Sequence, residues 1–302
     1  MMPLRSDAAA LSNMLRSDYT LLEVAIHSQQ GEDVLGHLVE HVDVNLYSNG
    51  QTLLHQAIAV DNVAAATLLL RCGADIHCDD ERNATPLHLA KSDDAVSLLL
   101  QRGACVKRQR YDGATPLHMC DLPTIAHLLV AHGANVHART FGGDTPLHGC
   151  KLAHKVKCLV DDGGADVEAA NANKYTPLHV ACSFGRWQVA VALLERNASL
   201  NSLDYSGRTP RDVVKAVRSI FVQLDTSDRL DLDRTLTTLD VWAAGRQRGH
   251  DNKAIYDQLV WHSLRPVCRD AKNVLMDALA LPFDIVNFIV VQWVGPWAVT
   301  VA

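Results

Sequence analysis

One tetrapeptide, Thr-Pro-Leu-His, recurs along this chain at a nearly constant spacing and limits what the chain can fold into. Four full copies begin at Thr85, Thr115, Thr145 and Thr176. A near copy begins at Thr52, and two degenerate copies begin at Thr20 and Thr209. Successive threonines are 32, 33, 30, 30, 31 and 33 residues apart. A period of this length indicates supersecondary units that bury their apolar faces on one another.

Each part of the tetrapeptide suits the start of a helix. Threonine is a good N-cap because its side-chain oxygen accepts a hydrogen bond from the first free amides. Proline suits the first helical position, where its missing N–H would have no partner. Leucine begins the buried stripe, and histidine takes the capping-box position, from which its side chain reaches back to the cap. The recurring histidines are therefore predicted to be architectural and not ligands: His55, His88, His118, His148 and His179.

A period near 33 with this tetrapeptide resembles the ankyrin repeat, and the resemblance covers roughly residues 15–222. It implies an all-α ankyrin-repeat solenoid of helix-turn-helix units joined by hairpin loops, with six to seven repeats. Residues 1–14 would form an N-terminal segment and residues 223–302 a C-terminal helical region. The degenerate first and last copies suit the ends of a stack, where one face meets water.

Three adjacent copies are shorter than the others. From the capping threonine to the closing glycine there are 18 residues for Thr85 and Thr115 and 19 for Thr145, against 21 for Thr52. The missing residues fall between the two helices of each copy and amount to nearly one helical turn. We expect a clipped first helix or a tighter turn there, and a local change in curvature.

In ankyrin-like proteins the hairpin tips line a concave recognition surface, with contact positions four, three and one residues before the threonine. The resemblance implies these partner-binding residues: Glu81, Arg82, Tyr111, Asp112, Phe141, Asp144, Tyr175, Tyr205 and Arg208. Only 5% of the chain is aromatic, yet Tyr111, Phe141 and Tyr205 share one register. Because aromatic side chains dominate interface hot spots, we expect these three to bind a partner. The alternative is that each ring lies flat on its own hairpin.

After residue 222 the period ends, and the pattern predicts three further helices. The first runs from about residue 232 to 244 after an acidic stretch, the second starts near Lys253, and the third covers about residues 267–279. From residue 278 to 302 the chain is nearly continuous apolar sequence. This tail is open to more than one interpretation.

One interpretation of the tail is a ligase-adaptor box. The stretch Leu281-Pro282-Phe283-Asp284-Ile285, with Ile289 and Trp293, resembles the opening helix of an F-box. Ankyrin repeats followed by such a box resemble the poxvirus PRANC proteins. The resemblance implies that the chain docks a Skp-family adaptor of a cullin–RING ubiquitin ligase through these residues: Leu281, Pro282, Asp284, Ile285 and Ile289.

Three alternatives for the tail stay open. Residues 263–268 are similar to the elongin-binding start of a SOCS box, with Leu281-Pro282 as its cullin box, although Lys272 stands where that pattern has an apolar residue. The tail is also compatible with a helix that only caps the repeats. A membrane helix over residues 283–302 is disfavoured because polar residues interrupt it and no basic flank follows.

Several function classes find no support in the sequence. No phosphate loop, nucleophile elbow or zinc-protease motif is present, so we expect no enzyme, catalytic residue or cofactor. His118-Met119-Cys120 and His148-Gly149-Cys150 lack a C-x-x-C partner, so no metal is expected. The net charge of −6 argues against nucleic acid. The first 15 residues lack the apolar core of a signal peptide, so we expect free thiols and a cytoplasmic location, with the nucleus, or the host cytoplasm for a viral protein, as alternatives.

Overall fold

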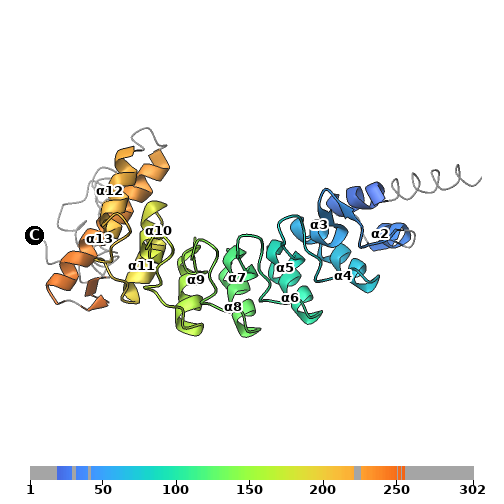
Figure 1. The fold of residues 1–302 in the computed structure, drawn as a ribbon, viewed down its shortest axis with the longest axis horizontal. Helices are drawn as coiled ribbons and strands as arrows, with labels where there is room; N and C mark the ends of the chain where they lie inside the picture. The colour runs from blue at the N-terminus through green and yellow to red at the C-terminus, as the bar shows by residue number, and fades with distance from the viewer. Residues whose placement is uncertain are drawn as a thin grey trace, which may run out of the picture. The chain divides into compact units, whose positions relative to one another are not determined.

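The computed structural model describes residues 19–28, 32–39, 42–220, 226–249, 251–252 and 254–255. This part of the chain is mainly helical, and its one sheet has two short strands, as predicted for an all-α solenoid. The chain divides into two compact units, Met1–Thr235 and Leu236–Ala302. In the first unit, consecutive helix pairs stand one beside the next in chain order (Figure 1).

Each repeat contributes a first and a second helix. Residues 19–27 form the first helix of copy one. The later first helices begin directly after the capping threonine: α3 (Leu53–Ala59), α5 (Pro86–Leu89), α7 (Pro116–Met119), α10 (Pro177–Ser183) and α12 (Pro210–Ile220). The second helices are α2 (Glu32–Val39), α4 (Val63–Arg71), α6 (Asp93–Gln101), α8 (Pro123–Ala131), α9 (Ala153–Lys157) continued by the π-helix η1 (Cys158–Asp162), and α11 (Trp187–Glu195).

Apolar side chains of both the first and the second helices form the core of the stack. Leu54 of α3, Leu69 of α4 and Leu193 of α11 are fully buried there. In the hairpin before α3, strand β1 (Tyr47–Ser48) pairs antiparallel with β2 (Gln51–Thr52), so that Tyr47 lies opposite Thr52. Seven described cysteines are free thiols: Cys72, Cys78, Cys105, Cys120, Cys150, Cys158 and Cys182.

The five recurring histidines join each repeat to the next. In the fifth copy His148 Nδ1 accepts a hydrogen bond from the Thr145 backbone N–H at 3.1 Å, which closes the predicted capping box. Its Nε2 lies 2.9 Å from the carbonyl oxygen of Tyr175 in the following repeat. Because a carbonyl only accepts, Nε2 carries the proton and the imidazole is neutral. The other four histidines make equivalent bonds.

Burial favours this neutral form. Desolvation lowers the pKa of His88 to about 4, against an ordinary value of 6.5. It lowers the pKa of the other four repeat histidines in the same direction. With both ring nitrogens engaged within the stack, these histidines are architectural, as the sequence predicts.

The short copies have clipped first helices, which confirms the prediction. Helices α5 and α7 have four residues each, whereas α3 and α10 have seven. In the fifth copy, residues 146–149 form only a turn. In the fourth and fifth copies, a cationic side chain from the following copy donates to backbone carbonyls of the shortened segment. Arg186 Nη1 donates to Cys150 O at 2.9 Å, and the buried Lys155 donates through Nζ to Leu117 O at 3.2 Å and to Cys120 O.

The fifth copy has one residue more than the fourth between its capping threonine and its closing glycine, and this extra residue lies in the second helix. The bond that closes the helix spans five residues in the fourth copy, from Ala134 N to Leu129 O. It spans six in the fifth, from Ala165 N to Leu159 O. The helix takes up the residue as the π-helix η1. Gly163 is required here, because a Cβ at this position would lie 2.7 Å from Leu159 O.

Helix α13 (Thr226–Gln247) is longer than the helix predicted for residues 232–244. Its start includes most of the acidic stretch. Within the first unit, Arg218 Nε of α12 forms an ion pair with Asp233 Oδ1 at 2.8 Å, and the Arg234 guanidinium lies over the Trp187 ring. In the second unit, Trp242 and Ile255 are buried. Residues 252, 254 and 255 are also helical, at the place where the helix starting near Lys253 is predicted. The rest of that helix, the third predicted helix and the adaptor-binding residues of the tail lie outside the described residues.

Candidate partner-binding surface

The hairpin tips of copies two to seven share one backbone geometry. The residue two positions before the capping threonine has a positive φ in all six: Gly50, Asn83, Gly113, Gly143, Lys174 and Gly207. Glycine is needed at Gly143, where a Cβ would lie 2.8 Å from the backbone nitrogen of Ala172 in the next hairpin. Four of these tips carry a dipeptide typical of turns: Asn49-Gly50, Asp112-Gly113, Gly142-Gly143 and Ser206-Gly207.

In copies three, six and seven, a polar side chain five residues before the threonine holds the tip closed. Asp80 Oδ1 accepts hydrogen bonds from the backbone N–H groups of Arg82 and Ala84, both at 2.8 Å. Asn171 and Asp204 make the same pair of bonds in copies six and seven. The tips are thus rigid, because local hydrogen bonds fix their backbones.

Neighbouring hairpins are also bonded to each other. The backbone N–H of Tyr111 donates to Arg82 O at 3.0 Å, that of Phe141 to Asp112 O at 2.8 Å, and that of Tyr205 to Asn173 O at 3.1 Å. The three aromatic residues therefore occupy the same position in their repeats, as their shared register predicts. Each sits on a backbone that is anchored to the preceding repeat.

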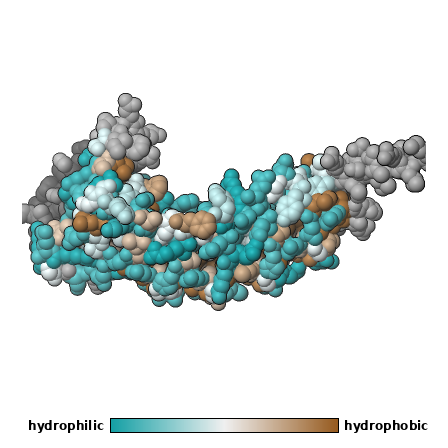
Figure 2. Space-filling view, in the orientation of Figure 1, coloured by the Kyte–Doolittle hydropathy of each residue, from teal (hydrophilic) through white to brown (hydrophobic). Residues whose placement is uncertain are grey.

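The three aromatic side chains are exposed. The exposed fraction is 56% for Tyr111, 80% for Phe141 and 73% for Tyr205, which leaves most of each ring in contact with water. Arg110 lies over the Tyr111 ring at 5.7 Å, and Lys174 lies over the Tyr205 ring at 5.2 Å. Figure 2 shows that apolar side chains form separate patches on an otherwise hydrophilic face. The exposed rings are available for contact with another molecule.

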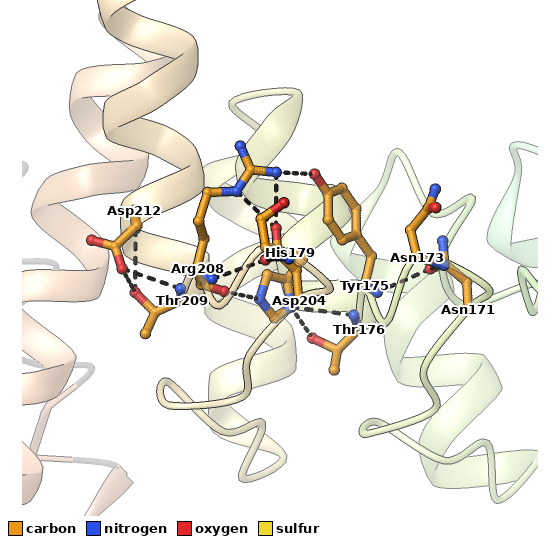
Figure 3. Close-up of polar contacts among 10 residues, drawn as sticks. Asn171, Asn173, Tyr175, Thr176, His179, Asp204, Arg208, Thr209 and Asp212 are labelled. Carbon is orange, nitrogen blue, oxygen red and sulfur yellow. Dashed lines mark hydrogen bonds and ion pairs between the residues drawn. The ribbon is translucent and has the colours of Figure 1, made fainter.

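Four other predicted contact residues are held by neighbouring side chains. Asp112 forms an ion pair with Arg110 at 2.8 Å, and Asp144 accepts a hydrogen bond from the Asn171 side chain at 2.7 Å. Figure 3 shows the other two, Tyr175 and Arg208, between copies six and seven. The remaining two, Glu81 and Arg82, are exposed.

The contacts of Arg208 tie the last two hairpins together (Figure 3). Arg208 Nη2 donates to the Tyr175 hydroxyl at 2.8 Å, and Nε donates to Asp204 Oδ2 at 2.9 Å. The Tyr175 ring stacks on His179, with centroids 5.6 Å apart and an interplanar angle of 15°. Tyr175 and Arg208 thus stabilise the end of the stack, a role that their register alone does not reveal.

The seventh copy caps its helix without a histidine. Asp212 Oδ2 accepts hydrogen bonds from the Thr209 hydroxyl at 2.7 Å and from its backbone N–H at 3.1 Å. The bond from the Thr209 hydroxyl holds the pKa of the Asp212 carboxyl below its ordinary value. A carboxylate has no donor to offer to the carbonyl of a further repeat, so this junction suits the end of the stack.

Two features of the surface lay outside the sequence predictions. Phe184, in the turn after α10, is 66% exposed, and the Arg186 guanidinium lies 4.5 Å from its ring centre. Among the described residues, one cluster could hold a metal ion: His127, Cys158 and Asp162. Part of this cluster is visible in the sequence, because Cys158 and Asp162 are four residues apart.

Helix pairs capped and joined in this manner define a helical-repeat solenoid. The chain belongs to the ankyrin-repeat family: the family model described as ankyrin repeats (3 copies) matches residues 54–140 and 120–204, which together span half of the chain. Within the described ranges, the structure has no helix long and apolar enough to cross a bilayer.

Curated relatives match over short segments. Protein phosphatase 1 regulatory subunit 27 of Homo sapiens and of Mus musculus is 38% identical over 71 residues, covering 22% of this chain and 46% of that protein. An ankyrin repeat-containing protein of Schizosaccharomyces pombe is 32% identical over 79 residues, covering 26% of this chain and 37% of that protein. The chain thus spans less than half the length of these relatives.

Solved ankyrin domains match over a longer range. The human ASB11 ankyrin repeat domain has a TM-score of 0.55 at 25% identity, covering 70% of this chain and 95% of that domain. The ankyrin repeat domain of Bcl-3, a member of the IkappaB protein family, has a TM-score of 0.51 at 24% identity, covering 70% of this chain and 97% of that domain. These matches establish the fold.

Proposed function

We propose that this chain is a non-enzymatic scaffold that binds a protein partner across its hairpin tips, with Tyr111, Phe141 and Tyr205 as anchors. The observation that carries the proposal is the exposure of three large rings at one repeat position on hydrogen-bonded backbones. A rigid backbone lowers the entropy lost on binding, and aromatic anchors contribute most of the energy of many interfaces. Ankyrin-family membership supports a partner that is a protein.

The test is affinity capture with the full chain. Immobilised wild-type chain and the variant Tyr111→Ala/Phe141→Ala/Tyr205→Ala are compared by quantitative mass spectrometry of retained proteins. A matched control is Leu203→Ala, which removes an exposed apolar side chain outside the tip position. We expect the control to retain the wild-type set and the triple variant to lose it. Equal retention by all three chains would reject the tip surface.

We further propose that the tail couples the bound partner to a cullin–RING ubiquitin ligase. The support is the F-box-like sequence Leu281-Pro282-Phe283-Asp284-Ile285, followed by Ile289. If this stretch is helical, Pro282 suits the first turn, and Asp284 is favoured there by the helix dipole. Ile285 and Ile289 recur four residues apart and would share one face of that helix.

A pull-down with purified adaptors separates the interpretations of the tail. We expect the wild-type chain to bind a Skp-family adaptor and the Leu281→Ala/Pro282→Ala/Ile285→Ala variant to lose it with the repeats still folded. Binding of elongin subunits instead would support the SOCS-like alternative. Binding of neither would leave the tail as a cap or a membrane-associated segment, and the repeats as a binding scaffold.

The likeness to a regulatory subunit of protein phosphatase 1 suggests a second candidate partner. We propose that this chain acts by binding a protein partner in the cytoplasm, and a phosphatase is one class of partner that the likeness suggests. Protein phosphatase 1 is therefore a useful purified probe for the tip surface, with the triple alanine variant as its control.

A further inference from the structure

Three side chains of the types that bind metals, His127, Cys158 and Asp162, meet where the fourth and fifth repeats pack together, and His154 lines the same cavity. His154, Cys158 and Asp162 follow one another at intervals of four residues along α9 and η1. Side chains four residues apart lie on one face of a helix, one turn above the other. Helix α8 packs beside this segment and contributes His127. The hydrogen bonds by which the five recurring histidines join neighbouring repeats are called histidine junctions below. None of the residues in this cluster takes part in a histidine junction or lies in a hairpin tip.

The distances within this cluster are short. A ring nitrogen of His127, the Cys158 sulfur and a carboxylate oxygen of Asp162 all lie within 4.8 Å of one another. His127 Nδ1 is 3.7 Å from Asp162 Oδ2. These side chains and His154 line an open cavity of about 600 Å³. Cys158 is buried at its base, whereas His127 and Asp162 are exposed and free to adjust.

The π-helix separates the roles of two adjacent carboxylates. Asp161 turns toward α11, where Arg196 holds it through two hydrogen bonds. The Arg196 bonds lower the pKa of the Asp161 carboxyl. Asp162 turns the other way and faces His127. The extra residue of the fifth copy therefore accompanies a carboxylate placed beside a thiol and an imidazole, and π-turns of this kind are frequent at functional sites.

We infer that His127, Cys158 and Asp162 form a binding site for a divalent transition-metal ion, with Zn²⁺ as the fitting ion. Thiolate, imidazole and carboxylate are the ligands that zinc takes in proteins, and a thiolate selects against Mg²⁺ and Ca²⁺. Binding releases the Cys158 thiol proton to solvent, and the resulting thiolate and the Asp162 carboxylate balance the charge of the ion. The fourth position is open to water or to His154.

The geometry needs only a small adjustment. Zinc bonds of about 2.0–2.3 Å in a tetrahedron put ligand atoms about 3.5 Å apart, so the three atoms, which lie within 4.8 Å of one another, must close by about 1.3 Å at most. The two exposed side chains supply this movement by rotation, while Cys158 stays in place. A bound ion would join α8 to η1 and so lock the fourth repeat to the fifth.

The test uses the full chain and two ions. After chelator treatment, calorimetric titration with Zn²⁺ alone is expected to give one tight site. Cys158→Ser, His127→Ala and Asp162→Asn should each weaken Zn²⁺ binding at least tenfold, because even the loss of an outer-shell partner of a ligand costs about 10–100-fold. Co²⁺ replaces Zn²⁺ as a spectroscopic probe, and a thiolate-to-cobalt charge-transfer band should appear in wild type and vanish in Cys158→Ser.

The chain has 15 histidines and eight cysteines, so the controls remove the same residue types elsewhere. His137→Ala and Cys72→Ser replace exposed residues outside the cluster, and both should keep wild-type affinity and the cobalt band. Far-UV circular dichroism shows whether Cys158→Ser is folded, and the exposed His127 and Asp162 variants serve if it is not. No tight site in wild type, or one unchanged in the His127 and Asp162 variants, would overturn the proposal.

Discussion

The histidine junctions and the hairpin tips lie only a few residues apart in each repeat, yet they differ in how they vary along the chain. Five junctions carry the same residue and the same bonds to cap and carbonyl. The tip position four residues before the threonine carries a different side chain in nearly every copy: Ser48, Glu81, Tyr111, Phe141, Ala172 and Tyr205. Uniform, buried positions hold the stack together, whereas variable, exposed positions are available for a partner.

The seventh copy shows what the junction needs. Asp212 caps Thr209 as the histidines cap their threonines, but a carboxylate cannot donate to a next repeat. The local cap and the link between repeats are therefore separate functions of one side chain. Only the link distinguishes an internal copy from a terminal one.

The largest effect on the free energy of unfolding is expected for a buried leucine in the core of the stack. Leu193→Ala removes a fully buried side chain from α11 and should lower the free energy of unfolding by ~2–5 kcal/mol. Leu203→Ala, at an exposed position, should change it by less than about 0.5 kcal/mol. Urea denaturation measures both, and a loss below about 0.5 kcal/mol for Leu193→Ala would mean that the buried face is wrongly assigned.

The junctions should make the stack sensitive to acid. The pKa of His88 is about 4 in the folded chain and 6.5 ordinarily, so the unfolded chain binds its proton first as the pH falls. The contribution of His88 is present above pH 6.5 and is lost as the pH drops toward about 4. A shift of this size corresponds to about 3 kcal/mol, and the other four histidines act in the same direction.

Denaturation midpoints measured between pH 7 and pH 4 check this expectation. The decline in stability should be shallower in His88→Asn than in wild type, because one buried group no longer takes up a proton on unfolding. His137→Ala, at an exposed position, should follow the wild-type curve. A His88→Asn curve parallel to wild type would contradict the assignment of a neutral, buried imidazole.

A single junction is expected to contribute less than the core leucine. His148→Ala leaves the Thr145 N–H without its partner and removes one of the two hydrogen bonds to the Tyr175 carbonyl, which keeps the bond from the Asn171 N–H. It should lower the free energy of unfolding by about 1–3 kcal/mol. His148→Asp retains an acceptor for the cap, as in the seventh copy, and isolates the loss of the link. Equal stability of wild type and both variants, measured by urea denaturation, would show that the link between repeats contributes little.

Much of the stack could be predicted because its determinants are local. The cap, the first-turn proline and the tip glycines act within a few residues, so the repeat boundaries and the clipped helices follow from sequence spacing. The sequence also shows 19 residues from Thr145 to Gly164, against 18 in the two preceding copies, but the prediction placed every length difference between the two helices of a copy. The place of the extra residue in a π-helix depends on packing against neighbouring helices, which spacing does not specify.

The surface was less predictable because exposure depends on partners from other repeats. Tyr175 and Phe141 both lie at predicted contact positions, but Tyr175 stacks on His179 and binds Arg208, whereas Phe141 is exposed. The metal-binding cluster joins His127 to residues some 30 positions further on, across two helices. Register in one repeat cannot reveal such contacts between repeats.

Among these variants, removal of the three aromatic anchors is expected to have the smallest effect on stability. It is also the most direct test of the contrast between the histidine junctions and the hairpin tips. Tyr111→Ala/Phe141→Ala/Tyr205→Ala and His148→Ala are compared for unfolding free energy and for capture of the partners retained by wild type. We predict that the tip variant stays within about 0.5 kcal/mol of wild type yet loses the partners, since truncating each anchor costs about 2 kcal/mol of binding. His148→Ala should lose stability and keep the partners. A tip variant that unfolds like the junction variant, or that binds like wild type, would contradict the assignment of recognition to the tips.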